Sequence, residues 1–182
     1  AKALALRLEV PLLGVNHLEA HLYSILLGLD AAATERALPA LVLLVSGGHT
    51  CLVRFDGAGR HLLLGRTVDD AAGEALDKGA KLLGLGYPGG PVLEATAAGG
   101  NAAFVPFPRG LAHNARRDLH VPHPELCFSF SGLKTALLYH LREHPTAPAD
   151  GTLAHLAASY QEAVVDTLAR QVERALDIVD VR

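Results

Sequence analysis

Hydrophobic and polar residues alternate along this chain with two spacings, and the spacing predicts which segments are helices and which are strands. Residues 1–10 have the pattern of the end of a helix, and residues 12–15 have that of a short strand. Asn16 is a good N-cap, and Glu19 three residues later completes a pair of the capping-box type. The helix that starts there is expected to bury a stripe at helical spacing: Leu18, Leu22, Ile25, Leu26 and Leu29.

Residues 40–67 are predicted to form three successive antiparallel strands, because apolar runs of strand length are separated by turn residues. The first two runs form a hairpin over residues 40–55, whose turn is Ser46-Gly47-Gly48, and a third strand covers residues 60–67. Glycine lets a ligand approach the backbone closely, so the N–H groups of this turn suit a phosphate. An ordinary hairpin turn is the commoner role of a Gly-Gly pair, and both interpretations stay open.

The rest of the chain is predicted to alternate helices with loops, after a domain junction around residues 30–38. In chain order we expect a helix from the cap pair Thr67 and Asp70 to about Leu83, a turn-rich loop over residues 84–91, a short helix from Val92, irregular structure over residues 99–127, a strand end at residues 128–132, a helix over residues 133–144, a linker over residues 145–151 and a long amphipathic helix over residues 153–179. The inward face of the long helix is expected to comprise Leu153, Leu156, Tyr160, Val164, Leu168, Val172 and Leu176.

Composition narrows the class of protein. The chain has 182 residues with a formal net charge of -3, and half of them are hydrophobic, which excludes a disordered chain and a surface that is basic throughout. Cys51 and Cys127 lie in apolar contexts and are expected to be reduced core thiols. No apolar run approaches the roughly 20 residues of a membrane span, so a cytoplasmic protein is expected. The chain starts without methionine inside a helical pattern, which indicates a piece of something longer.

His17 and His21 are four residues apart, so they share one face of the predicted helix and form a candidate metal-binding pair. Neutral imidazoles at this spacing suit zinc or iron, although such pairs also arise by chance. Two ligands do not complete a site. A metalloprotease of the HExxH type is disfavoured, because Glu19 is two positions after His17 and points away from any metal that the pair holds.

Charged residues crowd the predicted helix that follows the third strand. Asp70, Glu74, Asp77 and Lys81 share a face, and Lys78 is placed to pair with Glu74. This face is either a solvated, salt-bridged surface or the place where a carboxylate accepts hydrogen bonds from ribose hydroxyls.

Two further groups have an ordinary interpretation as well as a functional one. Tyr87-Pro88-Gly89-Gly90 is equally a stiff loop or one that fits closely around a ligand. Arg109, Arg116, Arg117 and Lys134 form a modest basic group, for which plain surface charge is the default interpretation.

Five segments together resemble the TsaD family, the tRNA N6-adenosine threonylcarbamoyltransferases, formerly called O-sialoglycoprotein endopeptidases. In order and rough spacing they are VNHLEAH, LLVSGGHT, DDAAGEALDKGAKLLGLGYPGGP, FPR and FSFSGLKT, which cover nearly the whole chain. The resemblance implies an α/β protein with the actin-like ATPase fold, in which two RNase H-like lobes clasp a nucleotide and a metal. Residues 1–35 would then be the end of the first lobe, with the metal-binding helix. Residues 36–182 would be the second lobe, incomplete at its C-terminus, with the nucleotide-binding hairpin and a helical insertion.

The same resemblance implies an activity, namely transfer of a threonylcarbamoyl group from threonylcarbamoyl-adenylate to N6 of the adenosine next to the anticodon in tRNA. It implies one divalent metal ion, iron or zinc, held by His17 and His21. It also implies an adenylate or ATP-type ligand, whose ribose Asp77 contacts and whose pocket Gly90 lines; Glu94 approaches the same ligand. Expected partners are tRNA and proteins of the same pathway, a truncated relative and a small ATPase, with no membrane. The nucleotide-binding hairpin corresponds to Leu44, Val45, Ser46, Gly47 and Gly48.

Some parts of the family pattern have no counterpart in this sequence, and no general base is assigned. They are an N-terminal strand and loop, a second glycine-rich loop with an asparagine, and an aspartate that completes the metal site. The isolated chain is therefore expected to hold metal feebly and to transfer no threonylcarbamoyl group. A sugar-kinase-like ATPase of the same superfold and a non-catalytic partner fragment remain as alternatives.

Overall fold

The computed structural model describes residues 1–110, 121–145 and 151–181. The chain divides into two compact units, Ala1–Ala37 and Leu38–Arg182, which are described separately below.

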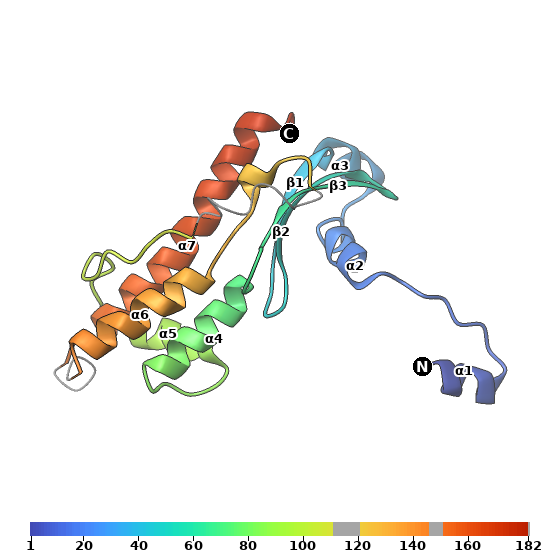
Figure 1. Ribbon diagram of the computed structural model, residues 1–182. Helices are drawn as coiled ribbons and strands as arrows, with labels where there is room; N and C mark the ends of the chain where they lie inside the picture. The colour runs from blue at the N-terminus through green and yellow to red at the C-terminus, as the bar shows by residue number, and fades with distance from the viewer. Residues whose placement is uncertain (111–120, 146–150, 182) are drawn as a thin grey trace. The chain divides into compact units, whose positions relative to one another are not determined.

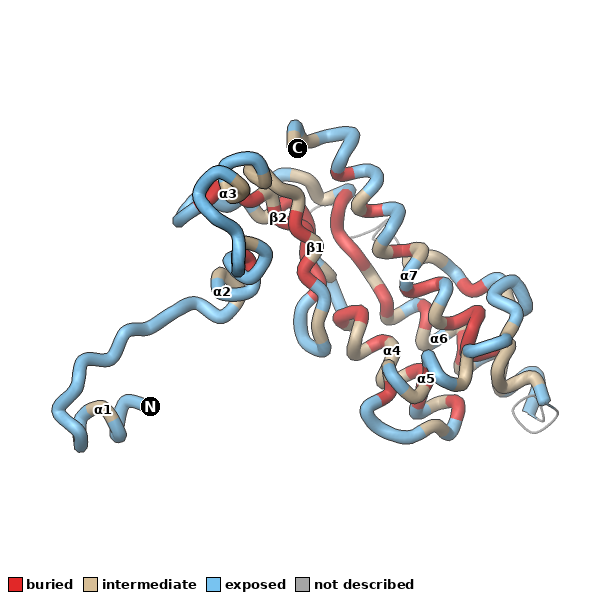
Figure 2. The backbone as a smooth tube through the Cα atoms, turned by 180° about the vertical axis from the view of Figure 1, so that it is seen from behind, coloured by how far each residue is buried: buried red, intermediate tan, exposed pale blue. Residues whose placement is uncertain are grey.

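The first unit contains three short helices, α1 (Lys2–Leu8), α2 (His17–Ser24) and α3 (Ala31–Ala37). The strand expected at residues 12–15 is wrong, because residues 10–16 have no regular structure and no neighbouring strand pairs with them. Residues 6–16 are exposed along their whole length (Figure 2).

The leucine stripe expected on α2 is confirmed only in part. Leu22 is buried, with 3% of its surface exposed. The helix ends at Ser24, however, so Ile25 and Leu29 fall in the turns beyond it and remain exposed. A stripe that is regular in sequence therefore extends past the helix that should carry it.

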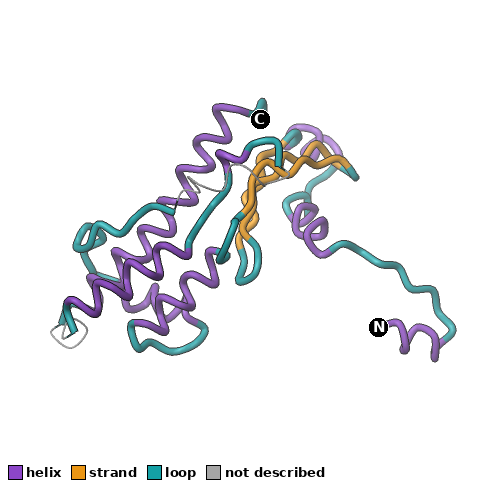
Figure 3. The backbone as a smooth tube through the Cα atoms, in the orientation of Figure 1, coloured by secondary structure: helices purple, strands orange, loops and turns teal. Residues whose placement is uncertain are grey.

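The second unit begins with the predicted antiparallel sheet, which is confirmed. Its strands are β1 (Ala40–Val45), β2 (Thr50–Gly57) and β3 (Arg60–Arg66), in the order β1-β2-β3 (Figure 3). The register pairs Val42 with Val53 and Leu44 with Cys51. These apolar pairs place one face of the sheet in the core.

The remaining elements of this unit are helical. They are α4 (Ala72–Leu82), α5 (Gly89–Ala97), the 3-10 turn η1 (Pro124–Leu126), α6 (Ser131–Glu143) and α7 (Leu153–Ile178). The long helix α7 packs against α4, α5 and α6, and α6 lies beside it in Figure 1.

The four predicted helices α4, α5, α6 and α7 are confirmed, but the first residue was predicted wrongly for three of them. Thr67 and Asp70 do not open α4: the Thr67 hydroxyl donates to the Asp70 carbonyl oxygen in a turn, and the helix starts at Ala72. The next helix, α5, starts at Gly89 rather than Val92, and α6 starts two residues before residue 133.

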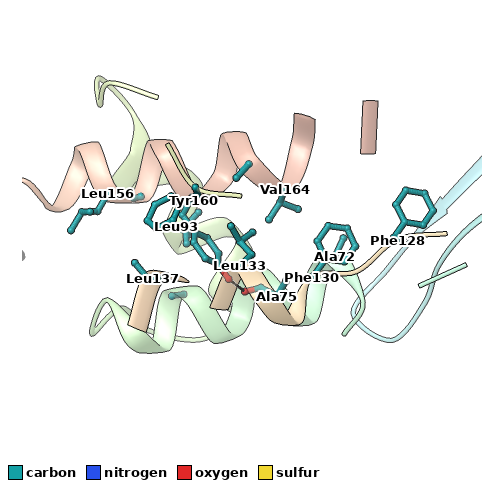
Figure 4. Close-up of a cluster of buried hydrophobic side chains, with 14 of the residues drawn as sticks. Ala72, Ala75, Leu93, Phe128, Phe130, Leu133, Leu137, Leu156, Tyr160 and Val164 are labelled. Atoms are coloured by element: carbon teal, nitrogen blue, oxygen red, sulfur yellow. Dashed lines mark hydrogen bonds between the residues drawn. The ribbon is translucent and has the colours of Figure 1, made fainter. Parts of the chain in front are cut away.

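The core of the second unit lies between the sheet and the helices, and Figure 4 shows its centre. Tyr160 is fully buried there, and its hydroxyl donates to the Ala75 carbonyl oxygen at 2.9 Å. The expected inward face of α7 is confirmed at Leu156, Tyr160 and Val164. It is wrong at Leu176, of which 53% is exposed.

Both cysteines are free and buried, as predicted. Burial raises the pKa of each thiol above its ordinary value, which keeps both Cys51 and Cys127 protonated and unreactive. None of the described helices combines the length and the apolar character that crossing a membrane requires.

Candidate nucleotide and metal sites

The glycine turn between β1 and β2 is open to solvent. Gly47, Gly48 and His49 are exposed, and Ser46 is half-buried. The Ser46 N–H donates to the His49 carbonyl oxygen at 2.8 Å, and the Ser46 hydroxyl oxygen accepts from the His49 N–H at 3.0 Å and the Gly48 N–H at 3.4 Å. The Gly47 N–H has no acceptor within the described residues. The turn is therefore not covered by another element, and its backbone donors lie at the surface.

This turn rests directly on the first turn of α4. The Gly73 N–H donates to the Ser46 carbonyl oxygen at 3.3 Å, and the Ala72 N–H donates to the Thr50 hydroxyl oxygen at 2.9 Å. A Cβ atom on Gly73 would lie 2.8 Å from the Ser46 oxygen and 2.9 Å from the Gly47 Cα. Sequence reasoning missed Gly73. A glycine in the first turn of a predicted helix was the available signal of a close backbone approach.

Asp77 and Gly90, which the resemblance placed at one ligand, are brought together by a helix-to-helix contact. Asp77 lies one turn of α4 beyond Gly73, and its Oδ1 accepts from the Gly89 N–H, the first residue of α5, at 2.8 Å. A Cβ on Gly89 would lie 2.5 Å from the Asp77 Cα, so only glycine lets the two helices meet this closely. Gly90 follows immediately. Glu94 lies one turn further along α5 and is exposed.

A pocket of about 340 Å³ lies beside Asp77, within the volume range of small-molecule sites. Its lining comprises Glu74, Asp77, Lys78, Lys81, Leu85, Gly86 and Tyr87.

Of the two lysines that line this pocket, one has carboxylate partners and the other has none among the described residues. Lys78 Nζ lies 2.7 Å from Asp70 Oδ1 and 3.0 Å from Glu74 Oε1, and these two hydrogen bonds raise the pKa of Lys78. Lys81 has no carboxylate partner in the part of the chain that the structure describes. The charged face of α4 thus carries the predicted Glu74–Lys78 ion pair and, in addition, one cation that is available to a ligand.

The histidine pair lies in the first turns of α2. The predicted N-cap is confirmed, because Asn16 Oδ1 accepts from the Leu18 N–H at 2.9 Å and the Glu19 N–H at 3.2 Å. The expected placement of His17 and His21 on one face is also confirmed: their Nε2 atoms lie 3.3 Å apart, and both residues are exposed.

This separation fits a shared metal ion. Two zinc–nitrogen bonds of about 2.05 Å at a tetrahedral angle place their nitrogen atoms roughly 3.3 Å apart. Within the described residues, no group of three or more His, Cys, Asp or Glu side chains is arranged to hold a metal. His17 and His21 are therefore a geometrically suitable pair that needs at least one further ligand.

The basic group named from the sequence does not form one patch in the described part of the chain. Arg109 Nε lies 2.6 Å from Asp166 Oδ2, so its charge is used in an ion pair with α7. Arg116 and Arg117 lie outside the described residues. Lys134 is on α6.

Sequence reasoning missed the role of Asp69, which anchors the FSFSG motif to the turn before α4. Its carboxylate accepts from the hydroxyls of Ser129 and Ser131, at 2.5 and 2.7 Å, and from the backbone N–H groups of Phe130 and Ser131, at 2.8 and 3.3 Å. Burial alone raises the pKa of Asp69, but these hydrogen bonds outweigh it and hold the pKa below its ordinary value. The motif is therefore fixed to the turn that precedes α4, and α4 is the helix against which the glycine turn packs.

Comparisons with known proteins show the family of this chain. The model of the family described as TsaD, tRNA N6-adenosine threonylcarbamoyltransferase, matches residues 1–182. This chain belongs to the TsaD family.

Its relatives carry the same description. A tRNA N6-adenosine threonylcarbamoyltransferase of Trichlorobacter lovleyi is 49% identical over 176 residues, which cover 97% of this chain and 47% of the relative. One of Anaeromyxobacter dehalogenans is 51% identical, covering 96% of this chain and 48% of the relative. One of Salinibacter ruber is 49% identical, covering 100% of this chain and 51% of the relative. The chain spans about half the length of the curated relatives it matches.

Proposed function

We propose that this TsaD-family chain provides the adenylate-binding surface, and part of the metal site, of a tRNA N6-adenosine threonylcarbamoyltransferase. The observation that carries the proposal is the alignment of the candidate ligand residues along one helix. The glycine turn packs on the start of α4 at Gly73, and Asp77 lies one turn further, directly against the start of α5. The donor for a phosphate, on the turn that packs against α4, and the acceptor for a ribose, on α4 itself, are thereby held at neighbouring points along this helix.

Within this surface the hairpin residues are assigned to the acyl-phosphate end of threonylcarbamoyl-adenylate. In the segment from Leu44 and Val45 through Ser46, Gly47 and Gly48, the exposed Gly47 N–H is the backbone donor left without an acceptor among the described residues, so it can stabilise negative charge without reorganisation. Fixing the adenylate in this way orients its carbamoyl carbon toward an incoming amine.

Asp77 and Gly90 are assigned to the ribose. Asp77 Oδ1 is already engaged by the Gly89 N–H, which fixes the orientation of the carboxylate. Its second oxygen is then available to accept from a ribose hydroxyl. Gly90 lies beside it without a side chain, so the sugar can approach the backbone of α5.

His17 and His21 are assigned to one divalent metal ion, iron or zinc, which supplies Lewis-acid stabilisation of the adenylate oxygens when it is bound. The two imidazoles hold their Nε2 atoms at a separation that suits such an ion. The N-cap bonds of Asn16 fix the start of the helix that carries them.

At the level of the whole protein we propose the actin-like ATPase fold with RNase H-like lobes. Residues 1–35 belong to the first lobe and residues 36–182 to the second in this proposal. The acceptor is the adenosine next to the anticodon in tRNA, and the protein partners are a truncated relative and a small ATPase of the same pathway.

The proposal is tested with a chimera in which residues 1–182 replace the matching half of the Trichlorobacter lovleyi relative. The chimera is incubated with threonylcarbamoyl-adenylate and unmodified tRNA, and the modified nucleoside is measured by mass spectrometry. We expect activity in the chimera and a loss of at least about a hundredfold in the His17→Ala and Asp77→Asn variants.

A Gly132→Ala variant is the control, because a Cβ at Gly132 meets nothing within 4 Å. A chimera that folds, as judged by circular dichroism, and yet modifies no tRNA would refute the proposed function. Full activity in the Asp77→Asn chimera would refute the ribose assignment.

A further inference from the structure

Aromatic and cationic side chains gather on the second half of α6. Tyr139 is 55% exposed, and the guanidinium carbon of Arg142 lies 6.0 Å from the centroid of the Tyr139 ring, at the outer limit of a cation–π contact. On the same segment the rings of His140 and His144 stack, with their centroids 4.5 Å apart. We call these four residues the ring platform. It brings flat side chains and one cation together in the last two turns of the helix and the residue that follows it.

The ring platform is held in place by the core of the second unit. The ring of His140 lies edge-on to that of Phe107, at 6.3 Å between centroids, and Phe107 lies edge-on to Tyr160 at 5.8 Å. The carbonyl oxygen of His140 accepts from the His144 backbone N–H at 2.9 Å and from its Nδ1 at 3.1 Å. Both imidazoles are therefore ordered before any ligand arrives, which lowers the entropic cost of stacking on them.

The charge of Arg142 is not used in an ion pair within the described part of the chain. Arg109 and Lys78, by contrast, each have a carboxylate partner. An unpaired guanidinium beside exposed rings suits single-stranded nucleic acid, because bases stack on the rings and the cation contacts the phosphates. The formal net charge of the chain is -3, so a contact with RNA has to be local, as this one is.

We propose that the ring platform binds unpaired bases of the tRNA anticodon arm, with Tyr139 stacking on a base and Arg142 contacting a phosphate. The proposal rests on the proposed function, because it takes tRNA as the acceptor from there. It adds a contact surface outside the adenylate site and names residues that determine affinity for the RNA.

Helix α6 connects the ring platform to the candidate adenylate surface. It begins at Ser131, whose backbone N–H and hydroxyl donate to Asp69 in the turn before α4. At about 1.5 Å per residue, Tyr139 and Arg142 lie roughly 12 and 16 Å along the axis from Ser131. This is about the length of four or five nucleotides at roughly 3.4 Å each. An RNA whose acceptor adenosine lies near the start of α4 therefore reaches the ring platform with nearby nucleotides of the same arm.

The test measures RNA binding to the chimera described above by fluorescence anisotropy. The probes are a labelled anticodon arm and a fully paired RNA duplex, whose bases are not available for stacking. We expect the arm to bind about tenfold more tightly than the duplex, since one stacked base contributes about this much. Tyr139→Ala should weaken the arm about tenfold and leave the duplex unchanged, whereas Tyr139→Phe, which keeps the ring, should bind as the unchanged chimera does.

Salt dependence separates the cation from the ring. Arg142→Gln should lower the slope of log affinity against log salt concentration by about 0.7, the value for one phosphate contact on a single strand, and Tyr139→Ala should leave the slope unchanged. Glu143 is exposed beside Arg142, so Glu143→Gln should strengthen binding of the arm about twofold by removing a charge that repels phosphate. Arg170→Gln is the matched control: it removes the same charge about 25 Å along α7 from the start of that helix and should leave the slope unchanged.

Kinetics of the same chimera distinguish a role in RNA binding from one in the fold. Tyr139→Ala should raise the KM for tRNA about tenfold and leave unchanged both kcat and the KM for threonylcarbamoyl-adenylate. A change in all three, with altered circular dichroism, would mean a structural role and overturn the proposal.

The remaining outcomes are also decisive. Arm and duplex binding equally well, or a Tyr139→Ala variant that binds the arm normally, overturns the ring platform and leaves the proposed function standing. An equal drop in salt slope for Arg142→Gln and Arg170→Gln overturns the assignment of Arg142. A chimera that binds the arm through these residues but modifies no tRNA refutes the proposed function and leaves the ring platform as an RNA-binding surface.

Discussion

Replacing Gly79 with alanine is expected to destabilise the second unit, although alanine is the better helix former. Gly79 lies within α4 where this helix crosses α7. A Cβ atom there would lie 2.2 Å from Tyr160 Cε1 and 2.7 Å from its Cζ. Ordinary carbon–carbon contact is about 3.7 Å, so the ring would have to move by about 1.5 Å.

Burial and a hydrogen bond both constrain the Tyr160 side chain. It is fully buried, and its hydroxyl is bonded to the Ala75 carbonyl oxygen, in the helical turn before Gly79. Overpacking a core costs about 1–3 kcal/mol, and breaking the hydroxyl bond costs about 1 kcal/mol more. The better helix propensity of alanine returns about 1 kcal/mol. The Gly79→Ala variant should therefore lose about 2 kcal/mol of unfolding free energy.

The assay is urea denaturation followed by far-UV circular dichroism, with the Gly132→Ala variant as control. Gly132 is in the first turn of α6, and a Cβ there meets nothing within 4 Å, so this variant should be neutral or more stable by up to about 1 kcal/mol. Gly79→Ala is also made in a Tyr160→Leu background, where the ring is gone and the substitution should cost little. An equal loss in both backgrounds, or no loss in the unchanged chain, would refute the reasoning.

Three further predictions concern the Asp69 carboxylate, the long helix and the histidines. The folded pKa of Asp69 is lowered from 3.8, so its carboxylate contributes stability that is present above that pH and lost as pH falls below it. The urea midpoint of the unchanged chain should therefore fall as the pH is lowered through this range. The midpoint of the Asp69→Asn variant should fall by less. Gln171→Ala should cost about 2–3 kcal/mol, since the buried amide donates to two backbone carbonyls at 3.1 and 2.6 Å. By contrast, Leu176→Ala should cost less than about 0.5 kcal/mol, and equal losses would mean that the buried face of α7 is placed wrongly. Calorimetric titration with zinc should detect binding that His17→Ala and His21→Ala each abolish, whereas an unchanged isotherm in either variant would exclude a shared ion.

The sequence by itself determined the features that depend on neighbours along the chain. The three strands follow from the alternation of apolar runs with turn residues, and their antiparallel pairing follows from the short connections. Asn16 caps α2 because its side chain reaches N–H groups two and three residues away. The convergence of His17 and His21 follows from helical geometry alone. Each of these features depends on residues that are close together in the sequence.

Only the tertiary structure decided which residues are fully buried in the C-terminal half of α7, where the expected Leu168 and Val172 are half-buried against the core. From Leu156 onward the expected face advanced four residues at each step, and a helix turns once in 3.6 residues, so this row rotates by about 40° per step and reaches solvent at Leu176. The true face continues through Thr167, Gln171 and Ala175, all fully buried. Two of these are polar, and they are buried because each finds a backbone partner on another segment, which no hydrophobic pattern reveals.

The candidate site shows the same division. Sequence motifs named the glycine turn, Asp77 and Gly90 as separate candidates, but their common line depends on contacts between segments far apart in the chain. Gly73 permits the turn to rest on α4, and Gly89 permits α5 to start against Asp77. Such contacts are selected by the shape of the whole core, because close packing leaves no room for a Cβ at either point. The sequence shows only that a glycine is present at each position, and the fold determines which backbone atoms pack against it.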